Sequence, residues 1–200
     1  MAEKSVWNKC WRCPVQKRLI IGVTGASGSI YATTLMNVLA SMDWQVELIM
    51  TLTGEKVLAY ETGIERSAFP ENVRIHENDN LFSALASGSY RTAGMVVIPC
   101  SMNTLGLMAT GTGDHLLARA AQVTLKERCP LVVVPREMPY NIIHLENMLR
   151  LARAGATIMP ASPGFYHQPK EIQDLVNHVV GKTLDQFGIE NTLFRRWNGV

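Results

Sequence analysis

The chain has 200 residues, of which 47% are hydrophobic and 18% charged, and its formal net charge is +2 at pH 7. This length allows one domain, or at most two small ones, with enough apolar residues for a sizeable core. The small net charge and the lack of a Lys/Arg-rich run argue against a nucleic-acid partner, and no apolar stretch approaches the roughly 18 residues that span a bilayer, which argues against a membrane partner.

The first 16 residues are interpreted as an N-terminal extension, and residues 17–200 are assigned to one domain. The extension lacks the apolar segment of a secretory signal, so we expect a cytoplasmic protein. It contains Cys10 and Cys13, but a structural zinc site needs a second pair at similar spacing, and the sequence has none. We therefore expect no metal at this CxxC pair.

After the extension, short apolar runs alternate with helical patterns. The predicted strands are residues 18–25, 45–51, 73–76, 94–101, 129–136 and 155–162. The predicted helices are residues 29–40, a short helix that ends at Glu61, one or two turns at 80–86, and then 103–109, 114–128, 141–153 and 170–186. Val- and Ile-rich strands that alternate with helices are typical of a parallel sheet covered on both faces. The sequence thus predicts an α/β fold with a single doubly wound parallel sheet of Rossmann or flavodoxin type.

In such folds ligands bind outside the carboxyl ends of the strands. The first strand end reads VTGASGS, where glycines let the backbone approach a ligand and the following helix offers N–H groups to an anion. The glycine spacing is GxxGxxG rather than the dinucleotide GxGxxG, and no acidic residue ends the second strand at Met50–Thr53. A mononucleotide phosphate is therefore favoured over NAD, and a plain strand-to-helix turn is the alternative.

Two further strand ends carry polar side chains. Ser101 and Thr104 stand three residues apart where a helix begins, so Ser101 is either a simple N-cap or part of a polar ligand site shared with the first loop. Arg136 and Glu137 follow the buried run LVVV. An arginine there can bind a phosphate through two hydrogen bonds, and the glutamate can be its partner or a proton carrier. A surface ion pair is the alternative.

The helix predicted at 114–128 has Asp114 as its expected N-cap. Its polar face carries residues at i, i+4, i+7 and i+11, namely His115, Arg119, Gln122 and Lys126. We interpret the first and third as solvated and leave the role of the two cations open. Tyr166 and His167 lie in the loop after the last strand, where a loop can close over a substrate, and Lys182 lies on the last helix.

Several catalytic signatures are absent from the sequence. It contains no GxSxG elbow, no Walker A motif, no HExxH motif and no DDxxD motif of the kind that holds Mg²⁺ in isoprenoid enzymes. Chemistry on a phosphate would therefore rely on Arg, Lys and hydroxyl groups, and we expect no metal.

Seven stretches together resemble the UbiX-type flavin prenyltransferases, formerly described as aromatic-acid decarboxylase subunits. They are TGASGS, PCSMNTL, RAAQVTLKER, PLVVVPREMP, IHLENMLRLARAGA, PASPGFYHQP and LDQFGI. The resemblance covers residues 17–199, and the combination of PREMP, HLENML and PGFYHQP is specific to the family. It implies a metal-independent enzyme that forms a homo-oligomer, a dodecamer of flavodoxin-like subunits.

The resemblance also implies the reaction. Members of the family join the dimethylallyl group of dimethylallyl phosphate to N5 and C6 of reduced FMN. The product, prenylated FMN, is used by UbiD-type decarboxylases. The expected cofactor is therefore FMN, and the expected partners are dimethylallyl phosphate and a decarboxylase that receives the product.

The site residues are implied by the same resemblance. Those expected to bind FMN are Gly25, Ala26, Ser27, Thr51, Ser101, Met102, Asn103, Thr104 and Arg136. Those expected to bind the substrate phosphate are Arg119, Lys126, Arg136, Glu137, Tyr166 and Lys182. Catalytic roles are expected for Ser27, Glu61, Lys126, Glu137 and Trp197. The tryptophan suits an allylic cation, whereas Glu137, Ser27 or the released phosphate can each relay the proton from C6.

One departure and three rival functions remain open at this point. Lys182 stands where many relatives have arginine. The lysine keeps the positive charge but cannot form the two parallel hydrogen bonds that an arginine makes to a phosphate. An FMN-dependent cysteine decarboxylase would carry a PASANT-like motif, but the chain reads PCSMNT. A non-catalytic FMN-binding accessory subunit would not need the set of Lys126, Glu137, Tyr166 and Lys182. Direct decarboxylation of an aromatic acid lacks a recognisable carboxylate site.

Overall fold

The computed structural model describes residues 17–199, so the predicted extension at 1–16 lies outside the described residues. The sheet has six strands in the order β3-β2-β1-β4-β5-β6, and every neighbouring pair is parallel. The strands are β1 (Arg18–Val23), β2 (Gln45–Met50), β3 (Val73–His76), β4 (Met95–Cys100), β5 (Leu131–Pro135) and β6 (Thr157–Ile158). The strand order reverses between β1 and β4, which confirms the predicted doubly wound sheet.

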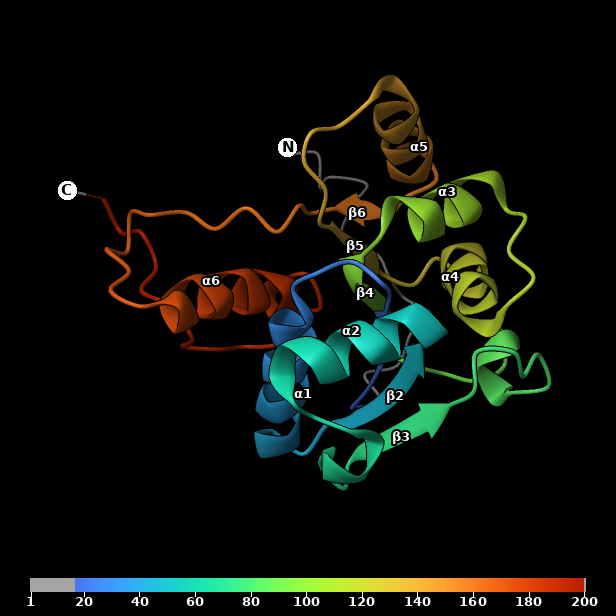
Figure 1. Ribbon diagram of the computed structural model, residues 1–200, viewed down its shortest axis with the longest axis horizontal. Helices are drawn as coiled ribbons and strands as arrows, with labels where there is room; N and C mark the ends of the chain where they lie inside the picture. Colours follow the sequence, from blue (N-terminus) through green and yellow to red (C-terminus); the bar gives the residue numbers. More distant parts are fainter. Residues whose placement is uncertain (1–16, 200) are drawn as a thin grey trace, which may run out of the picture.

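Helices cover both faces of this sheet (Figure 1). They are α1 (Ser29–Ser41), α2 (Leu52–Thr62), α3 (Met102–Thr110), α4 (Leu116–Lys126), α5 (Ile142–Arg153) and α6 (Ile172–Asp185), with the short 3₁₀ turns η1 (Arg66–Ala68) and η2 (Ala84–Ala86). On β1, Leu19 and Ile21 pack in the core with α1 and α6, whereas Ile20 packs in the core with α3, α4 and α5. None of the helices within residues 17–199 is long and apolar enough to cross a membrane.

The sequence prediction was wrong at two element ends. The strand expected at 155–162 is only the two residues of β6. The N–H groups of Met159 and Ala161 still donate to Val133 and Pro135 on β5 (2.9 and 3.3 Å), but Pro135 has no N–H with which to continue the pairing. The helix expected from Asp114 begins at Leu116, since His115 is its N-cap and accepts the N–H of Ala118 at Nδ1 (3.3 Å). The other predicted elements are confirmed to within a few residues.

A charged side chain lies inside the sheet. Glu47 of β2 is 1% exposed; its carboxylate accepts the Tyr90 hydroxyl hydrogen (2.5 Å) and lies 3.1 Å from Arg18 Nε and 2.6 Å from His76 Nε2. Burial by itself raises the pKa of Glu47, but the hydrogen bonds to His76 and Tyr90, with the charges of His76 and Arg18, outweigh it and lower the pKa. The His76 Nδ1 atom in turn contacts the Ser83 hydroxyl (3.0 Å). This buried network ties the segment between β3 and β4 to the sheet.

Candidate functional site

One threonine joins two loops at the carboxyl edge of the sheet. Thr24, directly after β1, is fully buried; its hydroxyl donates to the Pro99 carbonyl (2.9 Å) and accepts the Ser101 N–H (2.7 Å). Because β1 and β4 flank the point where the strand order reverses, these two bonds fix the loops at the place where such sheets bind ligands. The two hydroxyl-bearing loops found in the sequence therefore lie side by side.

The β4–α3 turn presents a helix N-terminus at this edge. Ser101 is the N-cap of α3: its hydroxyl accepts the Thr104 N–H (3.3 Å) and donates to the Thr104 hydroxyl (3.1 Å). Met102 and Thr104 are buried, whereas Asn103 is exposed. The first N–H groups of a helix have no partner inside the helix and favour an anion. The turn is thus well suited to bind a phosphate.

The N-terminus of α1 is already occupied by a carboxylate. Glu61, in the last turn of α2, accepts the N–H groups of Gly28 (3.0 Å) and Ser29 (2.8 Å). Gly28 has a φ of 105°, a conformation that a residue with a side chain rarely adopts. The sequence pattern favoured a phosphate at this loop, but a phosphate there would be repelled by Glu61 or would have to displace it. Of the two helix termini, that of α3 is the better anion site.

The hydrogen bonds to Glu61 predict a pH dependence of stability. Burial by itself raises the pKa of Glu61, but hydrogen bonds from the Ser27 hydroxyl and from the two backbone N–H groups outweigh it and lower the pKa. A carboxylate whose pKa is lowered by folding stabilises the folded protein above its unfolded pKa of about 4.3. That stabilisation is lost as the pH falls through the lower pKa of the folded state.

We therefore expect Glu61→Gln to lower the free energy of unfolding by about 0.5 to 1 kcal/mol at pH 7, a modest effect because the side chain is exposed and screened by solvent. The difference between the two proteins should shrink below about pH 4. Denaturant unfolding at neutral and acidic pH measures it. An equal difference at both pH values would show that the charge of Glu61 does not hold the loop.

Arg136 reaches from the end of β5 to the first loop. Its Nε donates to the Ser27 carbonyl oxygen (3.2 Å), and its backbone N–H donates to the Cys100 carbonyl (3.2 Å). Glu137 accepts the N–H of Met138 at Oε1 (3.1 Å). Among the described residues no ion pair joins Arg136 to Glu137, so the alternative of a simple surface ion pair is not supported.

The carboxyl edge gathers the residues that the resemblance assigns to FMN. Thr51 caps α2 by accepting the Gly54 N–H (3.0 Å), and its own N–H donates to the carbonyl of Val23, the last residue of β1 (3.0 Å). A Cβ atom on Gly25 would lie 2.6 Å from the Thr53 side chain, so any larger residue here would require Thr53 to move. Together with the contacts above, these bonds bring the predicted set to one edge: Gly25, Ala26, Ser27, Thr51, Ser101, Met102, Asn103, Thr104 and Arg136.

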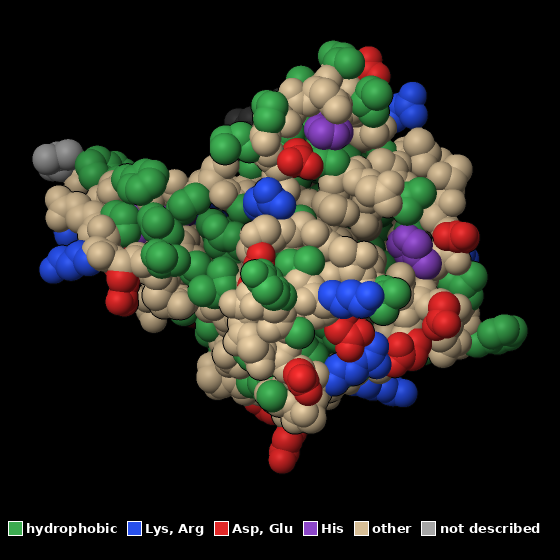
Figure 2. All heavy atoms as spheres, viewed as in Figure 1, with side chains coloured by type: hydrophobic (Ala, Val, Ile, Leu, Met, Phe, Trp, Pro, Cys, Tyr) green, Lys and Arg blue, Asp and Glu red, His purple; other side chains and the backbone are tan. Residues whose placement is uncertain are grey.

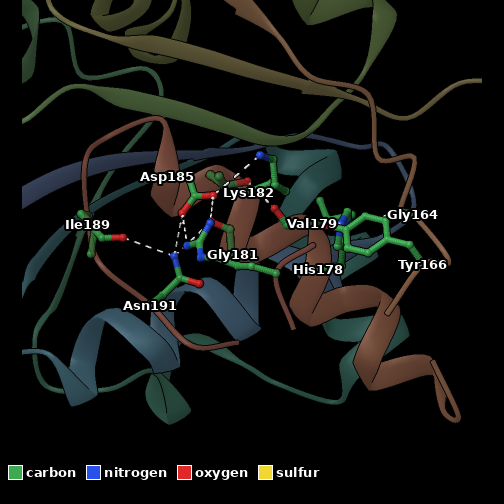
Figure 3. A network of polar contacts seen from close by, with 11 residues as sticks. Gly164, Tyr166, His178, Val179, Gly181, Lys182, Asp185, Ile189 and Asn191 are labelled. Carbon is green, nitrogen blue, oxygen red and sulfur yellow. Dashed lines mark hydrogen bonds and ion pairs between the residues drawn. The ribbon is translucent and has the colours of Figure 1, made fainter. Parts of the chain in front are cut away.

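Tyr166, Lys182 and Trp197 lie on the chain that follows β6, which leaves the edge of the sheet and returns through α6 to pack beside α1. The chain after β6 runs away from the sheet to the outer end of α6, and the C-terminal segment lies beside it (Figure 1). The rings of Tyr166 and Trp197 lie edge to face with centroids 6.2 Å apart. Lys182 Nζ is 3.7 Å from the Asp185 carboxylate, as Figure 3 shows. The same carboxylate binds Arg196 (2.7 Å). We call residues 159–199 the α6 arm.

The two cations of α4 lie elsewhere. Arg119 Nε donates to the Ala86 carbonyl (3.3 Å), and Lys126 pairs with Glu127 (3.0 Å). Because α4 leads into β5, its last residue lies at the amino edge of the sheet, roughly 15 Å from its first at the helical rise per residue. A single chain therefore does not bring Lys126 to the carboxyl edge or to the α6 arm.

Sequence reasoning missed three residues that organise these elements. Thr24 joins the two loops, His178 contacts Tyr166 on the arm, and Asp185 binds Lys182 and Arg196. For Thr24 a signal existed, since a hydroxyl directly after a buried strand and before a glycine-rich loop is a candidate for bonding the neighbouring strand end. The Tyr166–His178 and Asp185–Arg196 contacts have no local signal, because the partners lie 12 and 11 residues apart in sequence; only the Lys182–Asp185 pair is local.

Three comparisons with known proteins cover most of the chain. Residues 10–184 match the family described as Flavoprotein. The flavin prenyltransferase UbiX of Aquifex aeolicus is 46% identical over 190 residues, which cover 92% of this chain and 100% of that protein. The crystal structure of AnUbiX (PadA1) in complex with FMN and dimethylallyl pyrophosphate has a TM-score of 0.88 at 38% identity, with 92% of this chain and 98% of that chain covered. A dodecameric FMN-dependent UbiX-like decarboxylase from Escherichia coli O157:H7 has a TM-score of 0.87 at 42% identity, with coverages of 91% and 100%.

Proposed function

Because the chain belongs to the UbiX family of flavin prenyltransferases, we propose that it joins the dimethylallyl group of dimethylallyl phosphate to N5 and C6 of reduced FMN. One structural observation supports this most directly: Thr24 fixes the β1–α1 and β4–α3 loops together, and Arg136 reaches across to Ser27 at the same edge. The chain is thus a transferase whose product is prenylated FMN.

The residues at the carboxyl edge fit FMN. The N-terminus of α3 and the Ser101 hydroxyl offer donors to its phosphate, and Arg136 supplies a positive charge nearby. Gly25 and the buried Ala26 present little side-chain bulk at the first loop, which leaves room for a planar ring. When bound, the reduced flavin supplies the nucleophilic N5 atom and the C6 carbon to which the new bonds are made.

The prenyl donor needs groups that stabilise a leaving phosphate. Cleavage of the allylic C–O bond places negative charge on that phosphate, which preorganised cations and hydroxyl groups stabilise. We assign this task to Arg119, Lys126, Arg136, Tyr166 and Lys182. Trp197 is 61% exposed beside Tyr166 and offers its ring to the allylic cation.

Closing the ring at C6 requires the loss of a proton from that carbon. Glu137, Ser27 or the released phosphate accepts it, and all three carry an oxygen suited to the transfer. Glu61 holds the loop that carries Ser27 through the N–H groups of Gly28 and Ser29. Its contribution to catalysis therefore includes fixing the position of Ser27.

We infer that the groups assigned to the leaving phosphate meet between chains. Lys126 is at the amino edge of its own sheet, whereas Tyr166 and Lys182 are on the α6 arm. Figure 2 shows hydrophobic side chains over α5 at the top of the view, and five large exposed ones are Met138, Ile142, Ile143, Leu145 and Leu149. Such a patch is typical of a surface that another chain covers. We propose a homo-oligomer, a dodecamer like the Escherichia coli neighbour, with each site shared between subunits.

The proposed product, prenylated FMN, must be used by another protein. Prenylated FMN is a modified flavin that this chain makes rather than uses, so a second protein must receive it. We propose a UbiD-type decarboxylase as that recipient.

The test of this function measures the flavin itself. Purified protein should retain FMN, seen by its visible absorbance, because the carboxyl edge is prearranged for it. Anaerobic incubation with reduced FMN and dimethylallyl phosphate should yield a flavin heavier by one C5 unit, detected by mass spectrometry. A parallel reaction with the diphosphate ester identifies the preferred donor, and one without donor is the control. Protein that binds FMN but makes no heavier flavin with either ester would be an accessory subunit and would contradict the proposal.

A further inference from the structure

His178 lies between a backbone N–H and the hydroxyl of Tyr166 on the α6 arm, as Figure 3 shows. It is 8% exposed. The N–H of Gly164 points at its Nδ1 atom (3.3 Å), and the Tyr166 hydroxyl lies 3.1 Å from its Nε2 atom. Both ring nitrogens of this buried histidine therefore have partners. One partner, the Gly164 N–H, can only donate a hydrogen bond.

The fixed partner determines where the proton of the ring lies. Burial, together with the nearby charges of His167 and Lys182, lowers the pKa of His178, so the ring is neutral at pH 7. A neutral imidazole has one nitrogen that donates and one that accepts. Since the Gly164 N–H can only donate, Nδ1 must accept and Nε2 must carry the hydrogen. The Tyr166 oxygen then accepts a hydrogen bond from Nε2–H.

This arrangement leaves the hydrogen of the Tyr166 hydroxyl unused. No other hydrogen bond of that hydroxyl is found within residues 17–199. Tyr166 is 45% exposed, so part of its ring and hydroxyl end lies outside the core. Lys182 lies four residues after His178, which places both on the same face of α6. A phosphate drawn to Lys182 would thus meet a tyrosine that can donate.

We propose that His178 is a positioning residue: by donating to the Tyr166 oxygen from Nε2, it turns the tyrosine hydrogen toward the leaving phosphate of the prenyl donor. This inference rests on the proposed function, because the phosphate is that of the prenyl ester. The hydrogen bond itself is a property of the free protein. The two parts can therefore be tested separately.

The first experiment determines the tautomer without any turnover. Solid-state NMR of the full chain labelled with ¹⁵N-histidine distinguishes a protonated from an unprotonated ring nitrogen, and subtraction of the His178→Gln spectrum isolates the signals of this residue. We expect a neutral ring protonated at Nε2 at pH 7. A ring protonated at Nδ1, or at both nitrogens, would overturn the proposal whatever the enzyme makes.

The second experiment measures the effect on catalysis. His178→Phe keeps a ring but removes both nitrogens, whereas His178→Gln keeps an N–H donor. We expect kcat/KM for dimethylallyl phosphate to fall about tenfold in the phenylalanine variant, the size of one lost hydrogen bond to a charged complex. The glutamine variant should recover most of that loss, and FMN retention should be unchanged in both.

His167→Phe is the matched control, because that ring stacks on His178 (5.0 Å between centroids) and has no hydrogen bond to the Tyr166 hydroxyl. The His167→Phe variant should keep the kcat/KM of the wild type.

A double-variant test separates positioning from destabilisation. In a Tyr166→Phe background, His178→Phe should lower kcat/KM no further, because its effect depends on the Tyr166 hydroxyl. An equal loss in both backgrounds would indicate general destabilisation and would refute the positioning role. If the wild-type chain makes no heavier flavin, the proposed function fails, and the NMR result still decides whether His178 orients Tyr166.

Discussion

Replacing Lys126 with alanine is expected to leave FMN bound and to lower the rate of prenyl transfer by about 100-fold. FMN should remain because the residues proposed to bind it are in the loops around Thr24 and Arg136, whereas Lys126 is assigned to the phosphate of the prenyl donor. The rate should fall because one preorganised charge that stabilises a leaving group is worth about two to three powers of ten. Visible absorbance measures the flavin, and mass spectrometry of timed samples measures the rate.

A matched control and a mixing experiment complete this test. Lys56→Ala removes another exposed lysine, on α2, and should leave the rate unchanged. Co-expression of Lys126→Ala with Tyr166→Phe should restore part of the activity that each variant lacks alone, because mixed assemblies contain sites with both side chains intact. If the mixture stays as inactive as its parents, the two residues do not act in a site shared between subunits.

Replacing Glu47 with alanine is expected to lower the free energy of unfolding by about 3 kcal/mol. The carboxylate is 1% exposed and is the common partner of Arg18, His76 and Tyr90. Removing one member of a buried charge network leaves the others without compensation, which costs about 3 to 5 kcal/mol. Denaturant unfolding at a fixed protein concentration measures the change, since assembly adds to the apparent stability.

Glu55 provides the comparison for Glu47. It pairs with Arg66, which also pairs with Glu77, but these side chains are 33% to 58% exposed. Glu55→Ala should therefore cost less than about 1 kcal/mol. If both variants lose the same free energy of unfolding, burial does not determine how much these ion pairs stabilise the protein.

Much of the fold could be predicted because its signals are local. Apolar runs in the sequence predicted the strands β1, β2, β4 and β5. The alternation of these strands with helices predicted a parallel sheet. The sequence offered two roles for Ser101, an N-cap or part of a ligand site, and the structure confirms the N-cap. The final strand was overestimated because its length depends on the neighbouring strand, where Pro135 has no N–H to continue the pairing. At α4, an aspartate next to a histidine suggested the wrong cap.

The parts of the site that escaped prediction depend on distant contacts. Glu61 accepts N–H groups 32 and 33 residues earlier in the chain. No sequence pattern around Glu61 predicts that it holds the first loop in this way. Glu47 is the one charged residue of β2, and its role could not be predicted because its three partners come from three other segments. The separation of Lys126 from Tyr166 could not be predicted either, since it depends on the direction in which α4 crosses the sheet.

Glu61 has a consequence for the orientation of the bound nucleotide. Two adjacent helix N-termini, both open, would accept the same phosphate in either of two poses, and stray orthophosphate in either place. With an internal carboxylate seated at the N-terminus of α1, the proposed site leaves only the N-terminus of α3 for a dianion. We therefore expect the nucleotide to bind with a single polarity and to present the same face of its ring in every copy of the enzyme.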